Sequence, residues 1–167
     1  MPNAIPADAA AGLPPARMID PRGHRFGAAV SGLLLIGSFA LNAPIGVAIA
    51  LASIGISAAF GLRWSVYGIA WRRIVRILDL GKVEPEHEYP PRFAQTLGSV
   101  ALILSLLAFV AGAPAIGWTL ALAVAGLQGV LAITGYCLGC RLYFLRWWIP
   151  SLVTSIWSRA ARRRSLA

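Results

Sequence analysis

The sequence predicts an all-α integral membrane protein: a bundle of four membrane-spanning helices in two antiparallel hairpins, with amphipathic helices at the cytoplasmic surface. Three observations predict this fold. Hydrophobic residues make up 58% of the 167 residues, and charged residues only 13%, against about 25% in a typical soluble domain. No charged residue occurs from Phe26 to Leu62 or from Phe93 to Cys140. Each uncharged block has room for two spans of about 20 residues, separated by a proline-containing turn.

The placement of the basic residues indicates a membrane orientation and not nucleic-acid binding. The formal net charge is +9, which a nucleic-acid-binding protein would gather on a soluble face. Here all fifteen Lys and Arg residues lie before, between or after the two uncharged blocks. By the positive-inside rule, both termini and the central loop are predicted to be cytoplasmic. We therefore expect a multi-pass protein of a cytoplasmic membrane. Its expected partner is the lipid bilayer, and nucleic-acid binding is not expected.

Residues 1–16 are predicted to form a disordered tail. They are rich in Ala and Pro and contain no basic residue, so they lack the positively charged start of a signal peptide. The membrane domain is predicted to cover residues 17–148. Pro21 is expected to interrupt any helix at the start of this domain, which places the beginning of the first span near Phe26.

The four spans are predicted at about residues 26–42, 45–62, 93–111 and 116–138. Asn42-Ala43-Pro44 and Gly112-Ala113-Pro114 supply the two turns inside the hairpins. Frequent Gly, Ala and Ser residues in the spans favour close helix packing. No acidic or basic residue is embedded in them, which argues against an ion-coupled transporter with a charged relay.

Residues 64–80 predict an amphipathic helix that lies at the membrane surface. Apolar residues recur there at helical spacing: Trp64, Tyr67, Trp71, Ile74, Val75 and Leu78. Arg72, Arg73 and Arg76 fall on another face, so the aromatic face would enter the headgroup layer. Residues 82–91 are expected to form an acidic, proline-containing loop, and residues 149–167 a basic amphipathic tail.

The two hairpins resemble each other, which indicates an internal duplication, with chance similarity as the alternative. Arg25-Phe26 opens the first hairpin and Arg92-Phe93 opens the second. At the exits, Phe60-Gly61-Leu62 matches Leu138-Gly139-Cys140. This alignment places Cys140 where the first half has Leu62, so the cysteine pair would be an addition to one half only.

Cys137 and Cys140 are the only cysteines, and they form a Cys-x-x-Cys pattern at the predicted cytoplasmic end of the fourth span. Residues at i and i+3 of a helix lie on one face about 5–6 Å apart, which is within reach of a disulfide. Gly139 would let the backbone adjust as the bond forms. A structural disulfide is not expected in a reducing compartment. Three interpretations remain: redox exchange or sulfur transfer, a metal site, and packing of two small apolar side chains.

The expected position of the pair argues against an unusually reactive thiol. In the thioredoxin motif the reactive cysteine lies at a helix N-terminus, where the dipole stabilises the thiolate. Here the pair is expected at a helix C-terminus, where the dipole opposes a thiolate, and Arg141 would offset part of this effect. A tetrahedral metal site needs four ligands, and His24 and His87 are expected to contact solvent or lipid headgroups. No metal and no cofactor is therefore predicted.

Three further side chains are candidates for a supporting role. Arg25 and Arg92 stand at the entrances of the hairpins, where they either anchor to lipid phosphate or dock an anionic substrate or partner near the cysteines. Gln128 is a polar residue in the middle of the fourth span, where it either makes an interhelical hydrogen bond or serves the site.

Three parts of the chain carry a resemblance to a known family. They are Asp20-Pro21-Arg22 with Arg25-Phe26, then Pro90-Pro91-Arg92-Phe93-Ala94-Gln95, then Tyr136-Cys137-Leu138-Gly139-Cys140-Arg141-Leu142-Tyr143. They resemble the bacterial membrane family named domain of unknown function 4395 (DUF4395). The resemblance covers about residues 17–148, and the cysteine segment is its most specific part. It implies a four-span protein of the bacterial inner membrane with thioredoxin-like and sulfurtransferase-like companions.

The leading functional hypothesis is a membrane component of thiol-redox chemistry or of a sulfur relay. Cys137 and Cys140 would be the catalytic pair, which cycles between dithiol and disulfide or carries a persulfide. The supporting residues would be Arg141, Arg25, Arg92 and Gln128. A thioredoxin-like or sulfurtransferase-like cytoplasmic protein would be the partner. The alternatives are a non-catalytic scaffold that recruits cytoplasmic partners through its basic loops, and a small-solute carrier.

Overall fold

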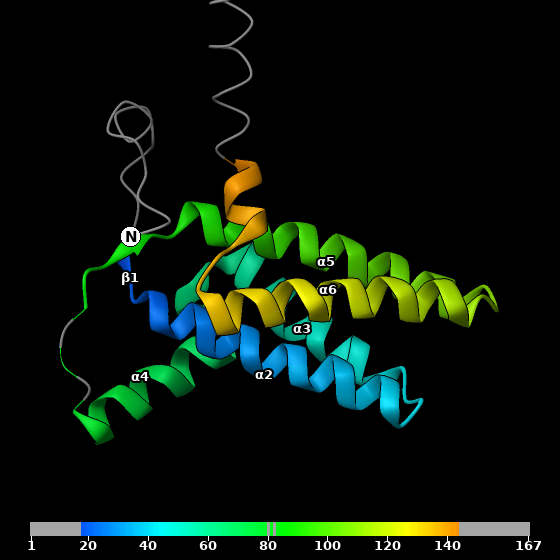
Figure 1. The fold of residues 1–167 in the computed structure, drawn as a ribbon, viewed down its shortest axis with the longest axis horizontal. Coiled ribbons are helices and arrows are strands. Elements are labelled where there is room, and N and C mark those ends of the chain that lie inside the picture. The colour runs from blue at the N-terminus through cyan, green and yellow to red at the C-terminus, as the bar shows by residue number, and fades with distance from the viewer. Residues whose placement is uncertain (1–17, 80, 82, 144–167) are drawn as a thin grey trace, which may run out of the picture.

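The computed structural model describes residues 18–79, 81 and 83–143 and shows an all-α fold built on four long helices (Figure 1). These helices are α2 (Pro21–Ala40), α3 (Ile45–Phe60), α5 (Tyr89–Val110) and α6 (Pro114–Thr134). A short 3-10 helix, η1 (Leu62–Trp64), leads from α3 to α4 (Val66–Leu78). The predicted tails, residues 1–16 and 149–167, lie outside the described residues.

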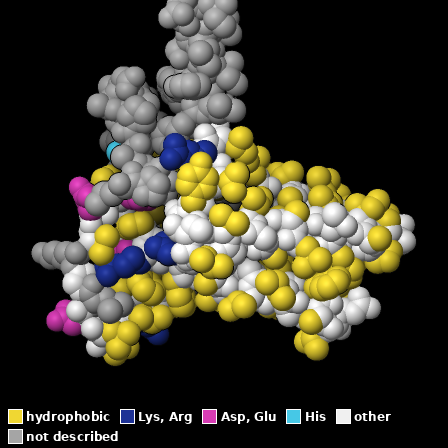
Figure 2. Space-filling model, in the orientation of Figure 1, with side chains coloured by type: hydrophobic (Ala, Val, Ile, Leu, Met, Phe, Trp, Pro, Cys, Tyr) yellow, Lys and Arg dark blue, Asp and Glu magenta, His cyan; other side chains and the backbone are white. Residues whose placement is uncertain are grey.

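The two hairpins, α2–α3 and α5–α6, pack against each other along their length. α2 lies chiefly on α6, and α3 lies chiefly on α5. Leu35, Val47 and Leu102 are fully buried at the centre of the core between them. Both hairpin turns lie at one end of the bundle, here called the turn end (Figure 1). The basic and acidic side chains gather at the opposite end, here called the charged end (Figure 2). The starts of α2 and α5 bring Asp20, Arg22, Arg25, Glu88 and Arg92 to this end.

The sides of the bundle expose large apolar residues (Figure 2). The exposed fraction is 69% for Leu33, 58% for Leu107 and 51% for Ile49. Soluble monomers rarely leave extended apolar surfaces in water. α5 and α6 are long and apolar enough to cross a membrane, while the apolar helix α3 is shorter. The predicted all-α class is therefore confirmed, and two helices are candidates for membrane spans.

α2 begins at Pro21, about one turn before the predicted start at Phe26. The expectation that Pro21 would interrupt a helix is wrong, because Pro21 occupies the first turn, where a backbone N–H has no intrahelical acceptor. Asp20 caps this turn, since its side chain accepts a hydrogen bond from the backbone N–H of Arg22 at 2.8 Å. α5 likewise begins at Tyr89 with prolines in its first turn, and not at Phe93.

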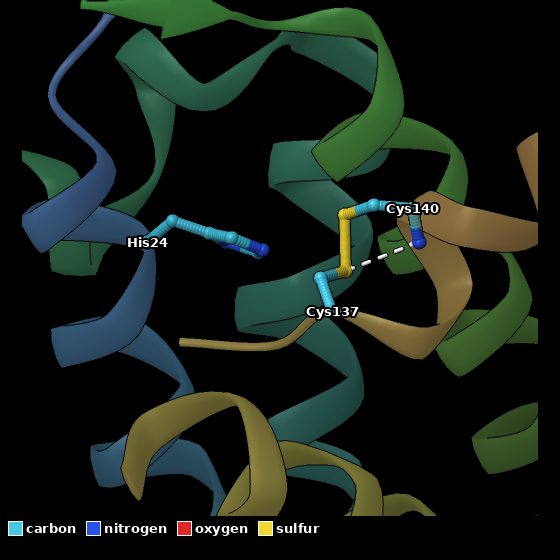
Figure 3. Close-up of side chains that lie close together, drawn as sticks. All are labelled: His24, Cys137 and Cys140. Carbon is cyan, nitrogen blue, oxygen red and sulfur yellow. Dashed lines mark hydrogen bonds between the residues drawn. A yellow bond between two sulfur atoms is a disulfide. The ribbon is translucent and has the colours of Figure 1, made fainter. Parts of the chain in front are cut away.

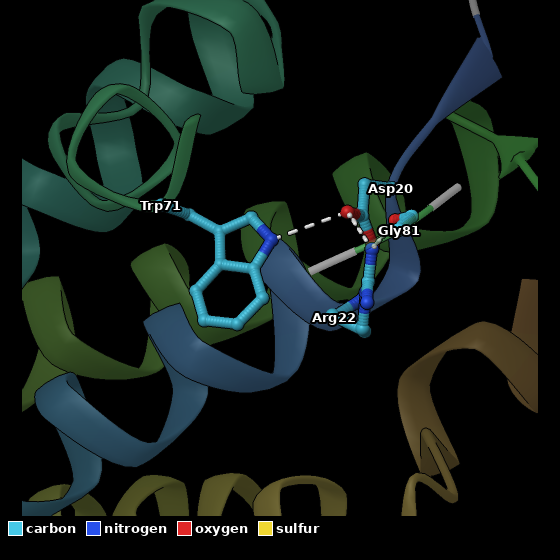
Figure 4. A network of polar contacts seen from close by, with 4 residues as sticks. All are labelled: Asp20, Arg22, Trp71 and Gly81. Atoms are coloured by element: carbon cyan, nitrogen blue, oxygen red, sulfur yellow. Dashed lines mark hydrogen bonds and ion pairs between the residues drawn. The ribbon is translucent and has the colours of Figure 1, made fainter. Parts of the chain in front are cut away.

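Asp20 also connects α2 to α4 (Figure 4). Its carboxylate accepts a hydrogen bond from Trp71 Nε1 at 3.2 Å and pairs with Arg22 at 3.3 Å, while Arg22 donates to the carbonyl of Gly81 at 2.9 Å. Burial raises the pKa of Asp20, but the hydrogen bonds from Arg22 and Trp71 outweigh it, so the pKa lies below its ordinary value. The aromatic face of α4 thus packs on α2, where Trp71 also contacts Phe26.

A two-stranded ladder joins the start of the domain to the loop before α5. β1 (Met18–Ile19) pairs antiparallel with β2 (Glu86–His87), with Met18 opposite His87 and Ile19 opposite Glu86. The acidic loop predicted for residues 82–91 therefore contains a short strand and the first turn of α5. Glu84 of this loop is exposed, but Glu88 is buried and accepts a hydrogen bond from the backbone N–H of Leu62.

Each hairpin is clamped by an arginine from the other. Arg25, at the start of α2, donates to the carbonyls of Ala132 and Ile133 at the end of α6, at 3.1 and 3.0 Å. Arg92, at the start of α5, donates to the carbonyls of Ala58 and Ala59 at the end of α3, each at 3.1 Å. The last carbonyls of a helix lack intrahelical donors and carry partial negative charge, so a guanidinium group satisfies both needs.

The two clamps support the internal duplication and correct its alignment. Gly61 ends α3 and Gly135 ends α6, and each follows its pair of clamped carbonyls at the same spacing. Gly135, and not Gly139, is therefore the counterpart of Gly61. Tyr136 then takes the place of Leu62, and the cysteine segment corresponds to the chain that leads into α4.

We predict that Arg92→Gln lowers the free energy of unfolding by about 1–3 kcal/mol. The carbonyls at the end of α3 would lose a charged donor, and buried Glu88 would lose its ion-pair partner at 3.9 Å. The measurement is unfolding by sodium dodecyl sulfate in mixed micelles. Arg76→Gln, on the exposed face of α4, is the matched control. An equal loss in both variants would contradict the clamp.

Candidate functional site

The cysteine pair follows a break in the helix that carries it. α6 ends at Thr134 because Gly135 adopts a φ of +73°, in the left-handed region that other residues disfavour. A new helical segment begins after Cys137 and covers residues 138–143, the last that the structure describes. Cys137 is therefore the N-cap residue of segment 138–143.

The prediction that the pair lies at a helix C-terminus is wrong. Cys137 Sγ accepts a hydrogen bond from the backbone N–H of Cys140 at 3.1 Å, which is the contact of a side chain that caps a helix N-terminus (Figure 3). The N-terminus of a helix carries partial positive charge. In the reduced protein this position favours a thiolate at Cys137, as in the thioredoxin motif.

Cys137 and Cys140 are joined by a disulfide, with their Cα atoms 5.2 Å apart. The two residues are only 4% and 5% exposed. Close packing of segment 138–143 against α5 depends on Gly139, since a Cβ added there would lie 2.6 Å from Cβ of Ala94. Gly139 therefore has a packing role besides the backbone freedom expected from the sequence.

His24 points from α2 toward the disulfide (Figure 3). One imidazole nitrogen of His24 and the sulfurs of Cys137 and Cys140 lie within 4.8 Å of one another. The Nε2 atom is buried and has no hydrogen-bond partner among the residues that the structure describes. Burial lowers the pKa of His24 to about 4, so the imidazole is neutral at pH 7. The expectation that His24 contacts solvent or headgroups is wrong.

These three side chains suit proton-coupled thiol chemistry. The neutral imidazole of His24 can accept a proton, and a Cys137 thiolate at a helix N-terminus is a nucleophile. The site therefore combines a base with an activated sulfur. The same three atoms are one ligand short of a tetrahedral zinc site. Within the described residues no other His, Cys, Asp or Glu joins this cluster.

A cavity of about 490 Å³ lies beside the cluster. Residues of α2, α3, α4, α5, α6 and segment 138–143 line it, and most of them are apolar. His24, Cys137 and Gly139 belong to its wall, and so do Gln95 and Gln128. The bundle therefore contains a partly open space of ligand size from which Cys137 can be reached.

The structure places the predicted supporting residues in different surroundings. Arg25 lies beside Gly135 and holds the end of α6, next to the cysteine loop. Gln128 accepts a hydrogen bond from Ser31 between α6 and α2 and also lines the cavity. Arg141 is exposed, with its guanidinium carbon 5.2 Å from the centre of the Tyr136 ring. Arg92 holds the end of α3 instead of contacting the cysteines.

The sequence interpretation missed the position of His24 beside the cysteines and the cavity next to them. Nothing in the spacing of His24 marks it, because its neighbours in the site come from the far end of the domain. Its position next to Arg25, which contacts the end of α6, is the one local sign that it would face the cysteine segment.

Comparison with known proteins identifies a family for most of the chain. A family model described as "Domain of unknown function (DUF4395)" matches residues 19–147. No curated protein and no solved structure gives a significant match. The matched region includes both hairpins, His24 and both cysteines.

We predict that acidification destabilises the protein through His24. Its pKa of about 4 in the folded state lies below the ordinary 6.5, so the unfolded chain takes up the proton first. The stability that neutral His24 contributes is complete above pH 6.5 and is lost as the pH falls toward 4. Within this window the free energy of unfolding should fall by about 1.4 kcal/mol per pH unit.

The measurement is detergent unfolding of wild type and His24→Gln at pH 7 and at about pH 5. The variant should show the smaller pH dependence, because it lacks the titrating group. His87→Gln, which removes the other histidine, is the control. A pH dependence in His24→Gln as large as that of wild type would show that another group is responsible.

Proposed function

We propose that this chain, which belongs to the DUF4395 family of unknown function, is a four-span membrane protein. Its Cys137–Cys140 pair would carry out thiol-redox chemistry. The observation that carries this proposal is the position of Cys137. It caps a helix N-terminus, forms a disulfide with Cys140 and lies beside His24, whose Nε2 atom has no hydrogen-bond partner among the described residues.

The membrane assignment rests on the surface of the bundle. Its sides expose large apolar residues, and its charged residues gather at one end (Figure 2). α5 and α6 have the length and composition of spans, and α2 and α3 pack beside them as the second hairpin. With four spans, the charged end would face the cytoplasm of a bacterial cell, as the positive-inside rule requires.

The proposed reaction is a reversible exchange of two electrons. A partner dithiol attacks the Cys137–Cys140 disulfide. One S–S bond breaks in this protein and one forms in the partner, so Cys137 and Cys140 become thiols. In the reverse direction the Cys137 thiolate attacks a disulfide of the partner and forms a mixed disulfide with it. The Cys140 thiol then attacks Cys137, which re-forms the Cys137–Cys140 disulfide and releases the partner as a dithiol. His24 accepts the proton that a thiol loses. In the relay form of this function, the Cys137 thiolate attacks the outer sulfur of a persulfide on the partner, becomes a persulfide itself and releases the partner cysteine as a thiolate.

The partner that we propose is a thioredoxin-like or sulfurtransferase-like protein of the cytoplasm. The cysteines directly follow the end of α6 at the charged end, within the part of the bundle that would be nearest to the cytoplasm. Both cysteines are buried, so segment 138–143 must move before a protein can reach Cys137. Because α6 ends before Gly135, this segment is not a continuation of α6 and can move without breaking that helix.

A scaffold role is the second candidate, and the surface of α4 favours it. Arg72, Arg73 and Arg76 are exposed on this helix, at the charged end, where an acidic partner would meet them. In that case charge reversal on α4 would impair function more than loss of both cysteines.

We predict that the two ends of the bundle lie on opposite sides of the membrane. In a Cys137→Ser/Cys140→Ser background, cysteines are introduced singly at Ala40 and Ala111, near the turns, and at Arg73 on α4. A membrane-impermeant maleimide should label the two turn positions in intact spheroplasts and Arg73→Cys only after permeabilisation. Equal labelling of all three in intact spheroplasts would contradict the four-span topology.

We predict that Cys140→Ser accumulates a disulfide-linked partner in cells, because Cys137 can attack but nothing resolves the adduct. Cys137→Ser should give much less, since the sulfur that accepts a backbone N–H at the helix N-terminus belongs to Cys137 and not to Cys140. The measurement is acid quenching, alkylation and a non-reducing gel, followed by identification of the adduct. The double variant is the control. No adduct from either variant, with freely alkylated thiols in wild type, would favour the scaffold.

A further inference from the structure

The cavity beside the cysteine pair reaches the disulfide from inside the bundle. Cys137 is part of the cavity wall, although both cysteines are almost fully buried. Thiol exchange requires the attacking sulfur to meet a disulfide sulfur directly, so a protein cysteine needs segment 138–143 to move aside. A molecule inside the cavity contacts Cys137 without this movement. The site therefore has two routes of access, and one of them suits a small molecule.

The cavity extends to the apolar side of the bundle. Apart from Met18 at the charged end, which is 51% exposed, four of its lining residues are between 42% and 53% exposed: Leu97, Leu127, Leu138 and Leu142. They belong to α5, α6 and segment 138–143. In the proposed membrane this opening meets lipid, so the molecule that enters there is lipid-soluble. Hydrophilic thiols such as glutathione do not fit this route.

The ligand must also offer a few polar atoms. His24 Nε2 and Gln95 Oε1 are buried on or behind the cavity wall, and neither has a hydrogen-bond partner among the described residues. An unpaired buried polar group costs about 1–3 kcal/mol, which a ligand with matching oxygens would recover. The side-chain amide of Gln95 can present either its oxygen or its nitrogen to such a ligand.

The volume and the chemistry of the cavity fit a ring with two oxygens. A cavity of about 490 Å³ lies within the range of about 300–1,000 Å³ that is typical of small-molecule sites. Its wall combines an apolar majority with the aromatic side chains of Tyr67 and Trp71. A flat, lipid-soluble molecule with an oxygen at each end of its ring meets these conditions.

From these observations we propose that the cavity binds a quinone, and that this quinone re-forms the Cys137–Cys140 disulfide. The proposal rests on the proposed redox function and deepens it by naming the class of electron acceptor. In the step, two S–H bonds break and one S–S bond forms. Two electrons and two protons pass to the two oxygens of the quinone, which becomes a quinol. His24 takes the proton of one thiol and passes it to a quinone oxygen, and the quinol returns to the bilayer.

The test uses the full chain in lipid nanodiscs. The protein is reduced with a phosphine, which is removed under anaerobic conditions, and decylubiquinone is then added. The ring of this quinone is fully substituted, so thiols cannot add to it. Quinol absorbance and maleimide labelling of the cysteines are followed together. Wild type should form one quinol per disulfide, and Cys137→Ser should form none. His24→Gln should be slower by about 100-fold.

Gly98→Leu tests whether the cavity is the site of this reaction. Gly98 lines the cavity, and no atom lies within 4 Å of a Cβ placed on it, so leucine would fill the cavity without a clash at its Cβ. Gly126→Leu is the matched control, because Gly126 has the same free space but does not line the cavity. Gly98→Leu should slow quinol formation at least about tenfold, and Gly126→Leu should not. The water-soluble oxidant diamide should re-form the disulfide in both variants.

Each outcome separates the inference from the function on which it rests. If quinone leaves the thiols reduced while diamide re-forms the disulfide, the quinone site is wrong and the redox function stands. If Gly98→Leu reacts with quinone at the wild-type rate, the cavity is not the site. If neither oxidant forms the disulfide, both proposals fail.

Discussion

The end of α6 at Gly135 is the constraint on which the site depends. Its left-handed backbone stops the helix at Thr134, and Arg25 from the other hairpin satisfies the carbonyls that are left without intrahelical donors. The chain can then begin a second helix, with Cys137 at its N-cap. Without this break the cysteines would continue α6 and lie at its C-terminus, where the helix dipole opposes a thiolate. One backbone conformation therefore decides the electrostatics of the pair.

Tertiary packing then gives the pair its surroundings. Gly139 lets segment 138–143 lie against Ala94 of α5, and α2 brings His24 to the sulfurs. The two arginine clamps place the ends of α3 and α6 at the starts of the opposite hairpins, so the charged end of the bundle is rigidly defined. The cysteines are shielded from solvent but open to an internal cavity. This arrangement suits a redox couple that exchanges electrons with selected partners only.

Much of the fold could be predicted from the sequence, and the chemistry of the site could not. The uncharged blocks and their Ala-Pro turns predict the helices, and the helical spacing of Tyr67 and Trp71 predicts α4. The break at Gly135 is hidden because apolar residues continue on both sides of it, and glycines are frequent in the spans. Pro21 was assigned the wrong effect, since proline interrupts a helix interior but fits its first turn. The approach of His24 depends on the packing of α2 on α6, which no local pattern encodes.

The central claim is that Cys137 and Cys140 form a reversible redox couple inside the bundle. Its most direct test is equilibration of the purified wild-type protein in glutathione buffers of graded ratio, followed by acid quenching, alkylation and intact-mass analysis. The account predicts one transition in which both thiols disappear together, without a lasting glutathione adduct, and which reverses when the buffer is made reducing. Two thiols that take up glutathione independently, or that neither glutathione disulfide nor diamide joins, would contradict it.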